Sequence, residues 1–241
     1  MKRYIKKIIR YLLSPLILAD YFRFRKLSIN NNRFSSAYSD IYPCIRDKTI
    51  KTCFDRHYVY HTAWAARKLA AIKPDLHIDI SSSLYFSGIV SAFVPIKFYD
   101  HRQADIELSN LESLKADILS LPFRDGSINS LSCMHVVEHI GLGRYGDKID
   151  PDGDIKAINE LKRVLAKDGS LLFVVPIGKK AIIQFNAHRI YTYNMIKELF
   201  TDLTLKEFSL IPEKSGALIE NASKADVDKE FYGCGCFWFV K

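Results

Sequence analysis

The sequence has no hydrophobic run long enough to cross a membrane, because the apolar stretch at residues 12–18 is short and contains Ser14 and Pro15. It also has no internal repeat and no low-complexity segment. What remains is an ordinary globular composition, with 48% hydrophobic and 26% charged residues in a chain of 241. A chain of this length can bury a full core, as one large domain or as a domain with an arm.

Cysteine is scarce and odd in number: the five residues are Cys44, Cys53, Cys133, Cys234 and Cys236. Their spacing shows no disulfide framework, which indicates reduced thiols in an intracellular protein. Cys234 and Cys236 share one face of a predicted strand, but a single C-x-C pair is weak evidence for a metal site. We therefore predict no metal ligands.

Most of the chain has no excess of positive charge. The net charge of +8 comes entirely from residues 1–50, which hold eleven Lys/Arg and three Asp, so residues 51–241 are balanced. This balance argues against a nucleic-acid groove, and we expect no nucleic-acid partner.

Residues 1–26 have the pattern of a basic amphipathic helix interrupted at Pro15. Three interpretations stay open: attachment to an anionic membrane surface, packing on a protein surface, and a cleaved signal. We expect a cytoplasmic protein, peripheral at the inner membrane face if the arm binds lipid. The predicted domains are a basic N-terminal arm at 1–55 and a globular domain at 56–241.

From residue 58 onward, helical and strand patterns alternate. Helices are expected at 58–72, 85–93, 154–166 and 192–200, and strands at 76–81, 96–100, 114–117, 127–134, 170–176, 203–211 and 234–240. Such alternation predicts an α/β fold with a doubly wound, mostly parallel sheet, and one of the closing strands should be antiparallel because no clear helix separates them.

The most specific segment is 116–178, which contains ADILSLPFRDGSINSLSCMHVVEHI and then ELKRVLAKDGSLLFVVPIG. In these residues the chain resembles the class I S-adenosylmethionine (SAM)-dependent methyltransferases, most closely the small-molecule group and a bacterial branch of it. The resemblance covers about residues 58–241 and implies a Rossmann-like, seven-stranded fold with SAM as cofactor. Asp168-Gly169 replaces the family's glycine pair, and Ser81, Ser82 and Ser83 stand where it has a glycine-rich turn.

The resemblance assigns the cofactor to residues at the ends of the first four strands. They are Asp79, Ser81, Ser83, Asp100, Asp117, Ile118 and His135. For the three aspartates and His135, a structural role as a cap, an ion-pair partner or a packed polar residue stays open.

Catalysis is expected from Glu138 and His139, which follow the fourth strand; His139 could remove a proton from an acceptor. The letters H-x-x-E-H at 135–139 also match a zinc pattern, but that pattern needs a helix where a strand is expected, and a third ligand is not evident. The G-x-G-x-x-G at 141–146 lacks the helix that a dinucleotide fingerprint requires. A divalent-cation site in the acidic run 147–154 remains a minor alternative.

Two polar segments are predicted to hold the acceptor. They are Arg144, Tyr145 and Asp147 in one loop and Asn186, His188 and Arg189 in the other. Arg144 could grip a phosphate or carboxylate, and Tyr145 could stack on a sugar. The predicted function is methyl transfer to a small or lipid-linked acceptor, such as a surface-glycan sugar or its precursor. The alternatives are a non-catalytic binding module of the same fold and a glycan-modifying transferase with another donor.

Overall fold

The computed structural model describes residues 15–29, 33–44 and 47–241. They form two compact units that divide between Phe54 and Asp55. In the first unit, α2 (Pro15–Leu27) buries none of its side chains. Pro15 begins this helix, a position where the missing N–H of proline costs nothing. The unit also holds the short 3-10 turn η1 (Tyr38–Asp40), and the part of the predicted amphipathic helix at 1–14 lies outside the described residues.

No helix among residues 15–29, 33–44 and 47–241 has the length and apolar character needed to pass through a bilayer.

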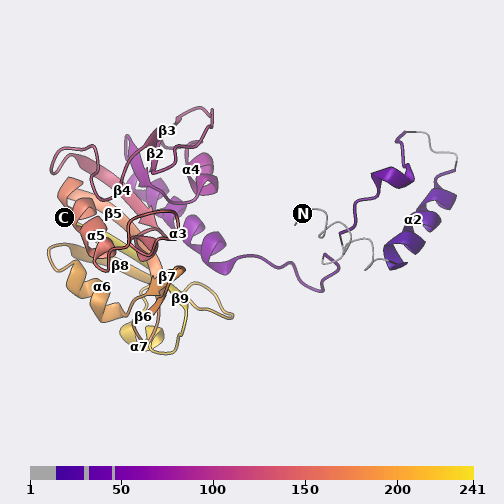
Figure 1. Ribbon diagram of the computed structural model, residues 1–241. Helices are drawn as coiled ribbons and strands as arrows, with labels where there is room; N and C mark the ends of the chain where they lie inside the picture. The colour runs from indigo at the N-terminus through magenta and orange to yellow at the C-terminus, as the bar shows by residue number, and fades with distance from the viewer. Residues whose placement is uncertain (1–14, 30–32, 45–46) are drawn as a thin grey trace. The chain divides into compact units, whose positions relative to one another are not determined.

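The second unit is built on a seven-stranded sheet with the order β3-β2-β1-β4-β5-β9-β8 (Figure 1). Its strands are β1 (His77–Ile80), β2 (Ile96–Asp100), β3 (Leu111–Lys115), β4 (Ile128–Met134), β5 (Leu165–Ile177), β8 (Thr204–Ile211) and β9 (Gly233–Val240). The first five pair in parallel, and β9 runs antiparallel to both β5 and β8. This confirms the predicted doubly wound, mostly parallel sheet of seven strands.

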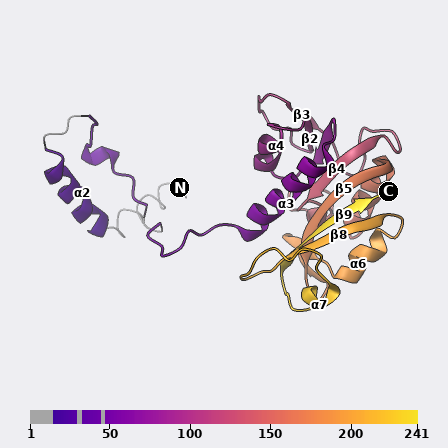
Figure 2. The same cartoon turned by 180° about the vertical axis from the view of Figure 1, so that it is seen from behind.

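Helices cover both faces of the sheet, as the two opposite views show (Figures 1 and 2). α3 (Arg56–Ile72) and α4 (Leu84–Val90) pack on one face through a core that includes Trp64, Leu69 and Phe86. The other face carries α5 (Gly153–Val164) and α6 (Tyr193–Leu199) over a second core. The short helix α7 (Lys224–Val227) precedes β9. The functional residues must therefore lie at the ends of the strands, because both faces are filled.

Local signals fix the limits of α3. The carboxylate of Asp55 accepts a hydrogen bond from the backbone N–H of Tyr58 at 3.2 Å and caps the first turn. Lys73 ends the helix in the left-handed conformation, with φ of 52°, directly before Pro74. The first turn of α3 is thus held at the sheet edge where β4 ends, as the contacts of His57 and His61 with His135 show.

Two predicted strands differ in their bounds from the structure, and one hairpin is missing from the prediction. β3 lies three residues before the expected position, and its alternating burial is that of an edge strand. β5 begins directly after α5, at Leu165, where a turn was expected to separate them. A hairpin of β6 (Ile182–Gln184) and β7 (His188–Ile190) was not predicted, because three-residue strands show no usable periodicity.

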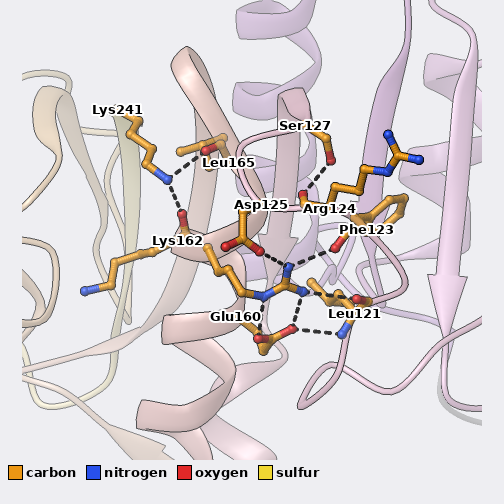
Figure 3. A network of polar contacts seen from close by, with 10 residues as sticks. Leu121, Phe123, Arg124, Asp125, Ser127, Glu160, Lys162, Leu165 and Lys241 are labelled. Atoms are coloured by element: carbon orange, nitrogen blue, oxygen red, sulfur yellow. Dashed lines mark hydrogen bonds and ion pairs between the residues drawn. The ribbon is translucent and has the colours of Figure 1, made fainter.

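A polar network ties the segment before β4 to α5. The guanidinium group of Arg163 donates to the carboxylates of Glu160 and Asp125 and to the backbone carbonyls of Leu121 and Phe123. Figure 3 shows these four partners gathered around the guanidinium group. The network fixes the Asp125-Gly126 turn and so the start of β4, whose other end carries the candidate catalytic residues.

Candidate functional site

The candidate residues gather at one edge of the sheet. β1, β2, β4 and β5 are parallel, so the loops after Ile80, Asp100, Met134 and Ile177 leave the same edge. Ligands of open α/β sheets bind at this edge. A surface hollow of about 520 Å³ lies elsewhere, beside the start of β4 at Ser127–Asn129, and holds none of the candidate residues.

The loop after β1 is a serine turn. Ser81 has a φ of 55°, a left-handed conformation that glycine adopts at low cost, and both its N–H and its hydroxyl donate to the carbonyl of Tyr99. The hydroxyl of Ser82 accepts from the N–H of Met134 at 3.0 Å. Ser83 is the N-cap of α4, although its hydroxyl makes no capping hydrogen bond. The serines therefore produce the turn and tie it to β2 and β4.

Asp79 lies beneath this turn, with no exposed surface. Its carboxylate accepts hydrogen bonds from Ser132 and, at 2.9 Å, from Ser87. Burial raises the pKa of Asp79 to about 6, although the serine hydroxyls oppose the shift. His77 continues the network, with Nδ1 and Nε2 each 2.8 Å from a serine hydroxyl. Asp79 thus supports the turn from below through its serine partners, and its contact with a cofactor stays a prediction.

The acids after β2 and β3 cap their own turns. Oδ1 of Asp100 accepts from the N–H of Arg102 at 2.7 Å, and Oδ1 of Asp117 accepts from that of Leu119 at 2.9 Å. Ile118, which follows β3 beside Asp117, is 8% exposed and packs in the core. Each carboxylate thus has one oxygen in a turn and a second that is free of these capping bonds.

Beyond β4, the chain turns sharply into the 3-10 turn η2 (Val137–His139). His135 has a φ of 58°, and its Nδ1 lies 2.8 Å from Oε1 of Glu138. Glu138 is 1% exposed, and its Oε2 has no hydrogen-bond partner among the described residues. Burial raises the pKa of Glu138 to about 7, so this carboxyl group is poised between its two protonation states near neutral pH.

His139 has a defined tautomer. Its Nδ1 lies 2.6 Å from the carbonyl oxygen of Ala187, which can only accept, and 3.3 Å from Nη1 of Arg144, which can only donate; the much shorter contact favours the proton on Nδ1 and the lone pair on Nε2. Nε2 is 3.8 Å from Oε1 of Glu138. Burial lowers the pKa of His139, so its ring is neutral at pH 7 and able to accept a proton.

The predicted acceptor loop is organised by Asp147. Its carboxylate accepts from the backbone N–H groups of Gly141, Gly143 and Tyr145 at 2.7, 3.2 and 3.2 Å. Burial opposes ionisation here, but these donors outweigh it and lower the pKa of Asp147. Asp147 therefore shapes the loop from within.

Arg144 and Tyr145 form the exposed part of the same loop. The Tyr145 ring meets the ring of His139 edge-on at 5.6 Å, and the guanidinium groups of Arg102 and Arg144 lie 5.1 and 5.2 Å from its centre. Arg144 also donates to the carbonyl of Ala187 at 3.1 Å. A cation and an aromatic face are thus offered beside the candidate base.

The residues of the second predicted acceptor segment lie in two different environments. Asn186 contacts the carbonyl of Leu142 at 3.5 Å, and the ring of His188 lies 6.3 Å from that of His139, so both reach the site. Arg189 is 5% exposed and donates to the carbonyls of Ile140 and Pro151 at 2.6 and 3.0 Å. Arg189, predicted to hold an acceptor, has its guanidinium group on the 140–151 loop and holds that loop against β7.

Five further residues of the site were not predicted from the sequence. They are His57, Tyr58 and His61 from α3, Tyr232, and Cys234 from β9. The ring of His135 stacks on those of His57 and Tyr58 at 5.5 and 5.6 Å and meets His61 edge-on at 5.0 Å. Five of the seven histidines in the sequence therefore lie at this site: His135 and His139 contact Glu138, His57 and His61 contact His135, and His188 lies beside His139. The available signal was the spacing of four residues between His57 and His61, which places both on one face of a helix.

Comparisons at the level of sequence give partial matches. Residues 123–228 match the family described as Caenorhabditis protein of unknown function, DUF268. The uncharacterized protein MJ0638 of Methanocaldococcus jannaschii is 29% identical over 113 residues, which cover 44% of this chain and 42% of that protein. The match thus spans less than half the length of this curated relative.

Solved structures resemble the chain over a larger part. N-methyltransferase NodS from Bradyrhizobium japonicum WM9, in complex with S-adenosylhomocysteine, is 16% identical with a TM-score of 0.51, and the match covers 75% of this chain and 85% of that one. The 1,6-didemethyltoxoflavin-N1-methyltransferase of Burkholderia thailandensis, also with S-adenosylhomocysteine bound, is 11% identical with a TM-score of 0.53, covering 75% and 78%. The sheet and helices of residues 55–241 thus have the Rossmann-like fold of these methyltransferases.

Proposed function

We propose that residues 55–241 form a SAM-dependent methyltransferase that acts on a small or lipid-linked acceptor. The observation that carries the proposal is the position of His139, a neutral imidazole with its lone pair on Nε2, at the sheet edge where this fold binds ligands. A base of this kind is needed next to an acceptor hydroxyl. The two structural neighbours described above are methyltransferases, which supports the choice of reaction.

The residues around the serine turn fit the cofactor. Ser81 supplies the left-handed backbone conformation that the turn requires, and the hydroxyl of Ser83 is free of capping bonds and can donate to a carboxylate. Oδ2 of Asp100 can accept from a ribose hydroxyl, because the turn engages only Oδ1. S-adenosylmethionine would supply an electrophilic methyl group at this edge.

The chain's own residues would then manage the proton. Nε2 of His139 accepts the proton of the acceptor hydroxyl, and the nearby carboxylate of Glu138 stabilises the imidazolium ion that results. The hydrogen bond from Nδ1 to Ala187 keeps the ring in the productive tautomer. Because methyl transfer is an in-line displacement, this orientation is the main contribution of the protein.

For the acceptor we propose a surface-glycan sugar or its lipid-linked precursor. Arg144 can bind a phosphate or carboxylate and Tyr145 can stack on a sugar ring, and both side chains are exposed. The basic first unit supports a place at the inner face of a membrane: α2 exposes Leu16, Phe22 and Phe24 and carries Arg23, Arg25 and Lys26 in the same helix.

Isothermal titration of the full chain with SAM tests the cofactor. We expect binding, and we expect Asp100→Asn to weaken it about 10- to 100-fold, since a charge-assisted hydrogen bond contributes about 1.5–3 kcal/mol. Asp105→Asn is the matched control, because Asp105 is exposed in the same loop. Absence of heat at millimolar SAM would refute the proposed function.

The acceptor is tested with methyl-labelled SAM and fractionated cell extracts. Label in the glycolipid fraction supports a lipid-linked acceptor, and label only in water-soluble sugars supports a free one.

Flotation with anionic and with zwitterionic vesicles tests the membrane proposal. We expect binding to anionic vesicles alone, reduced when Arg23, Arg25 and Lys26 are changed to Gln; equal binding to both vesicle types would contradict it.

One observation favours a second candidate, a binding module or a transferase with a donor other than SAM. Ser82 adds a side chain, hydrogen-bonded to the N–H of Met134, where a glycine turn would leave room for a ligand. In either case SAM gives no thermal shift. A nucleotide sugar stabilises the protein if it is a transferase with another donor, and none of the donors stabilises it if it is a binding module.

A further inference from the structure

The geometry points to a zinc site formed by His57, His135 and Cys234, and this inference does not rest on the proposed methyl transfer. His135, which the resemblance assigns to the cofactor, would be a metal ligand instead. One ligand atom from each residue lies within 4.8 Å of those of the other two. The three residues come from α3, the end of β4 and the start of β9. Two imidazoles and a thiolate are donors that zinc prefers.

The spacing of the donors suits one ion. Nε2 of His135 lies 3.4 Å from Sγ of Cys234, and tetrahedral zinc holds a nitrogen and a sulfur ligand roughly 3.6 Å apart. The rings of His57 and His135 have centres 5.5 Å apart and differ by 11° in orientation. The donor atoms lie within 4.8 Å of one another, so side-chain movement has to bring them closer when one ion binds all three.

The lone pair of His135 points toward the cluster because of Glu138. Nδ1 lies 2.8 Å from the Glu138 carboxylate and donates to it, so the lone pair of the ring is on Nε2, which faces Cys234. A carboxylate behind a histidine is the usual support of a zinc ligand, since it fixes the ring and increases its basicity.

Unpartnered polar atoms around the cluster provide a second, independent observation. The His61 side chain is fully buried, donates from Nδ1 to the carbonyl of His57 at 2.6 Å, and leaves Nε2 without a partner among the described residues. Oε2 of Glu138 is likewise buried without a partner. Such groups are costly in a protein interior, and a dication in their midst would compensate the negative charge of Glu138 and of the thiolate.

Binding is written as an exchange of a proton for the metal. The thiol of Cys234 loses its proton to solvent, its sulfur bonds to zinc, and the two imidazole nitrogens complete three protein ligands. A fourth position would remain for water, which is the arrangement of zinc sites that activate a ligand.

Metal content and cobalt spectroscopy of the untagged full chain test the proposal. We expect stoichiometric zinc after growth with zinc, and a thiolate-to-cobalt charge-transfer band when the metal-free protein is titrated with Co²⁺. Cys234→Ser should abolish the band and weaken zinc binding by at least about 100-fold, and Glu138→Gln should weaken it about 10- to 100-fold. Cys133→Ser, another buried cysteine that belongs to the core of the other sheet face, should leave both unchanged.

The test does not depend on the folding of one variant, because the cobalt spectrum of the unaltered chain is itself decisive. His57→Gln provides a second ligand variant. No cobalt binding, or cobalt bound without the thiolate band, would overturn the site. If Cys234→Ser or His57→Gln loses zinc but still binds SAM as the unaltered chain does, the result supports the metal site and leaves the proposed function intact.

Discussion

The hydroxyl of Ser132 donates to the carboxylate of Asp79, and through its contact with Nε2 of His77 it joins an acid and a base that are both fully buried. Burial raises the pKa of Asp79 to about 6 and lowers that of His77 to about 3. Both groups are therefore biased toward their neutral forms, and each makes the stability of the fold depend on pH in the opposite direction.

For Asp79 the folded state binds the proton more tightly than the unfolded state does. Its contribution to the free energy of unfolding is therefore largest below about pH 4 and declines as the pH rises to about 6, by up to about 3 kcal/mol. His77 has the opposite sign, because its pKa is lowered, and it reduces stability below its ordinary value of 6.5.

The difference between the unaltered chain and Asp79→Asn isolates the aspartate. In urea unfolding at a series of pH values, the unaltered chain should lose stability relative to the variant between pH 4 and 6, the window set by the pKa of Asp79. A difference that stays constant across this window would contradict the burial of an ionisable Asp79.

Two glycines of the 141–146 loop should respond unequally to alanine. Both have a left-handed φ, 81° for Gly141 and 85° for Gly146, but a Cβ on Gly141 would lie 2.0 Å from the carbonyl oxygen of Asp150, whereas one on Gly146 meets nothing within 4 Å. Gly146→Ala should lower the free energy of unfolding by about 1–2 kcal/mol, and Gly141→Ala by at least about 3 kcal/mol, since steric overlap is added to backbone strain. Equal losses on thermal unfolding would show that the loop can move away from β-carbon contact.

Substitution of the two arginines at this loop should also have unequal effects on the free energy of unfolding. Arg189 is buried and lies 3.5 Å from the carboxylate of Asp154, so Arg189→Met should cost about 3–5 kcal/mol by leaving a buried charge without its partner. Arg144→Met changes an exposed side chain and should alter stability by less than about 0.5 kcal/mol. Equilibrium unfolding in urea measures both, and equal midpoints would refute the structural role of Arg189.

If His139 is the base, His139→Gln should lower kcat about 100- to 10,000-fold while the Kd for SAM stays the same. His101→Gln is the control, because His101 is exposed in the loop after β2 and has no role in the site. Turnover is followed as S-adenosylhomocysteine release with the acceptor fraction that takes the label. Unchanged kcat in His139→Gln would remove the imidazole from the mechanism.

The main elements of the fold could be predicted because their residues carry the periodicity of their structure. β2 was placed at 96–100, and the apolar run of β5 was recognised as a buried strand. The β6–β7 hairpin was missed, since Ile183 and Phe185 are exposed and nothing in so short a segment distinguishes a strand from a loop. Strand identity follows from local pattern, but a three-residue pair depends on its partner.

The site was harder to predict than the fold. One of the two serines that donate to Asp79 is distant in sequence: Ser87 is 8 residues away but Ser132 is 53, so the chain alone could not reveal that the carboxylate is enclosed. In the same way Cys234 meets His135 across 99 residues, through the pairing of β9 with β5. A single sequence gives the residue types at each strand end, whereas these encounters depend on the order of strands in the sheet.

The antiparallel strand β9 has a consequence for synthesis. β8 leaves the ribosome before β9, yet in the sheet β9 separates it from β5, so β8 must wait for a strand that has not yet been made. During that interval Phe208 and Leu210, both buried in the finished protein, have no sheet to join. The nascent chain therefore presents an unpaired apolar strand while residues 212–232 emerge, which is the stage at which a chaperone would bind it.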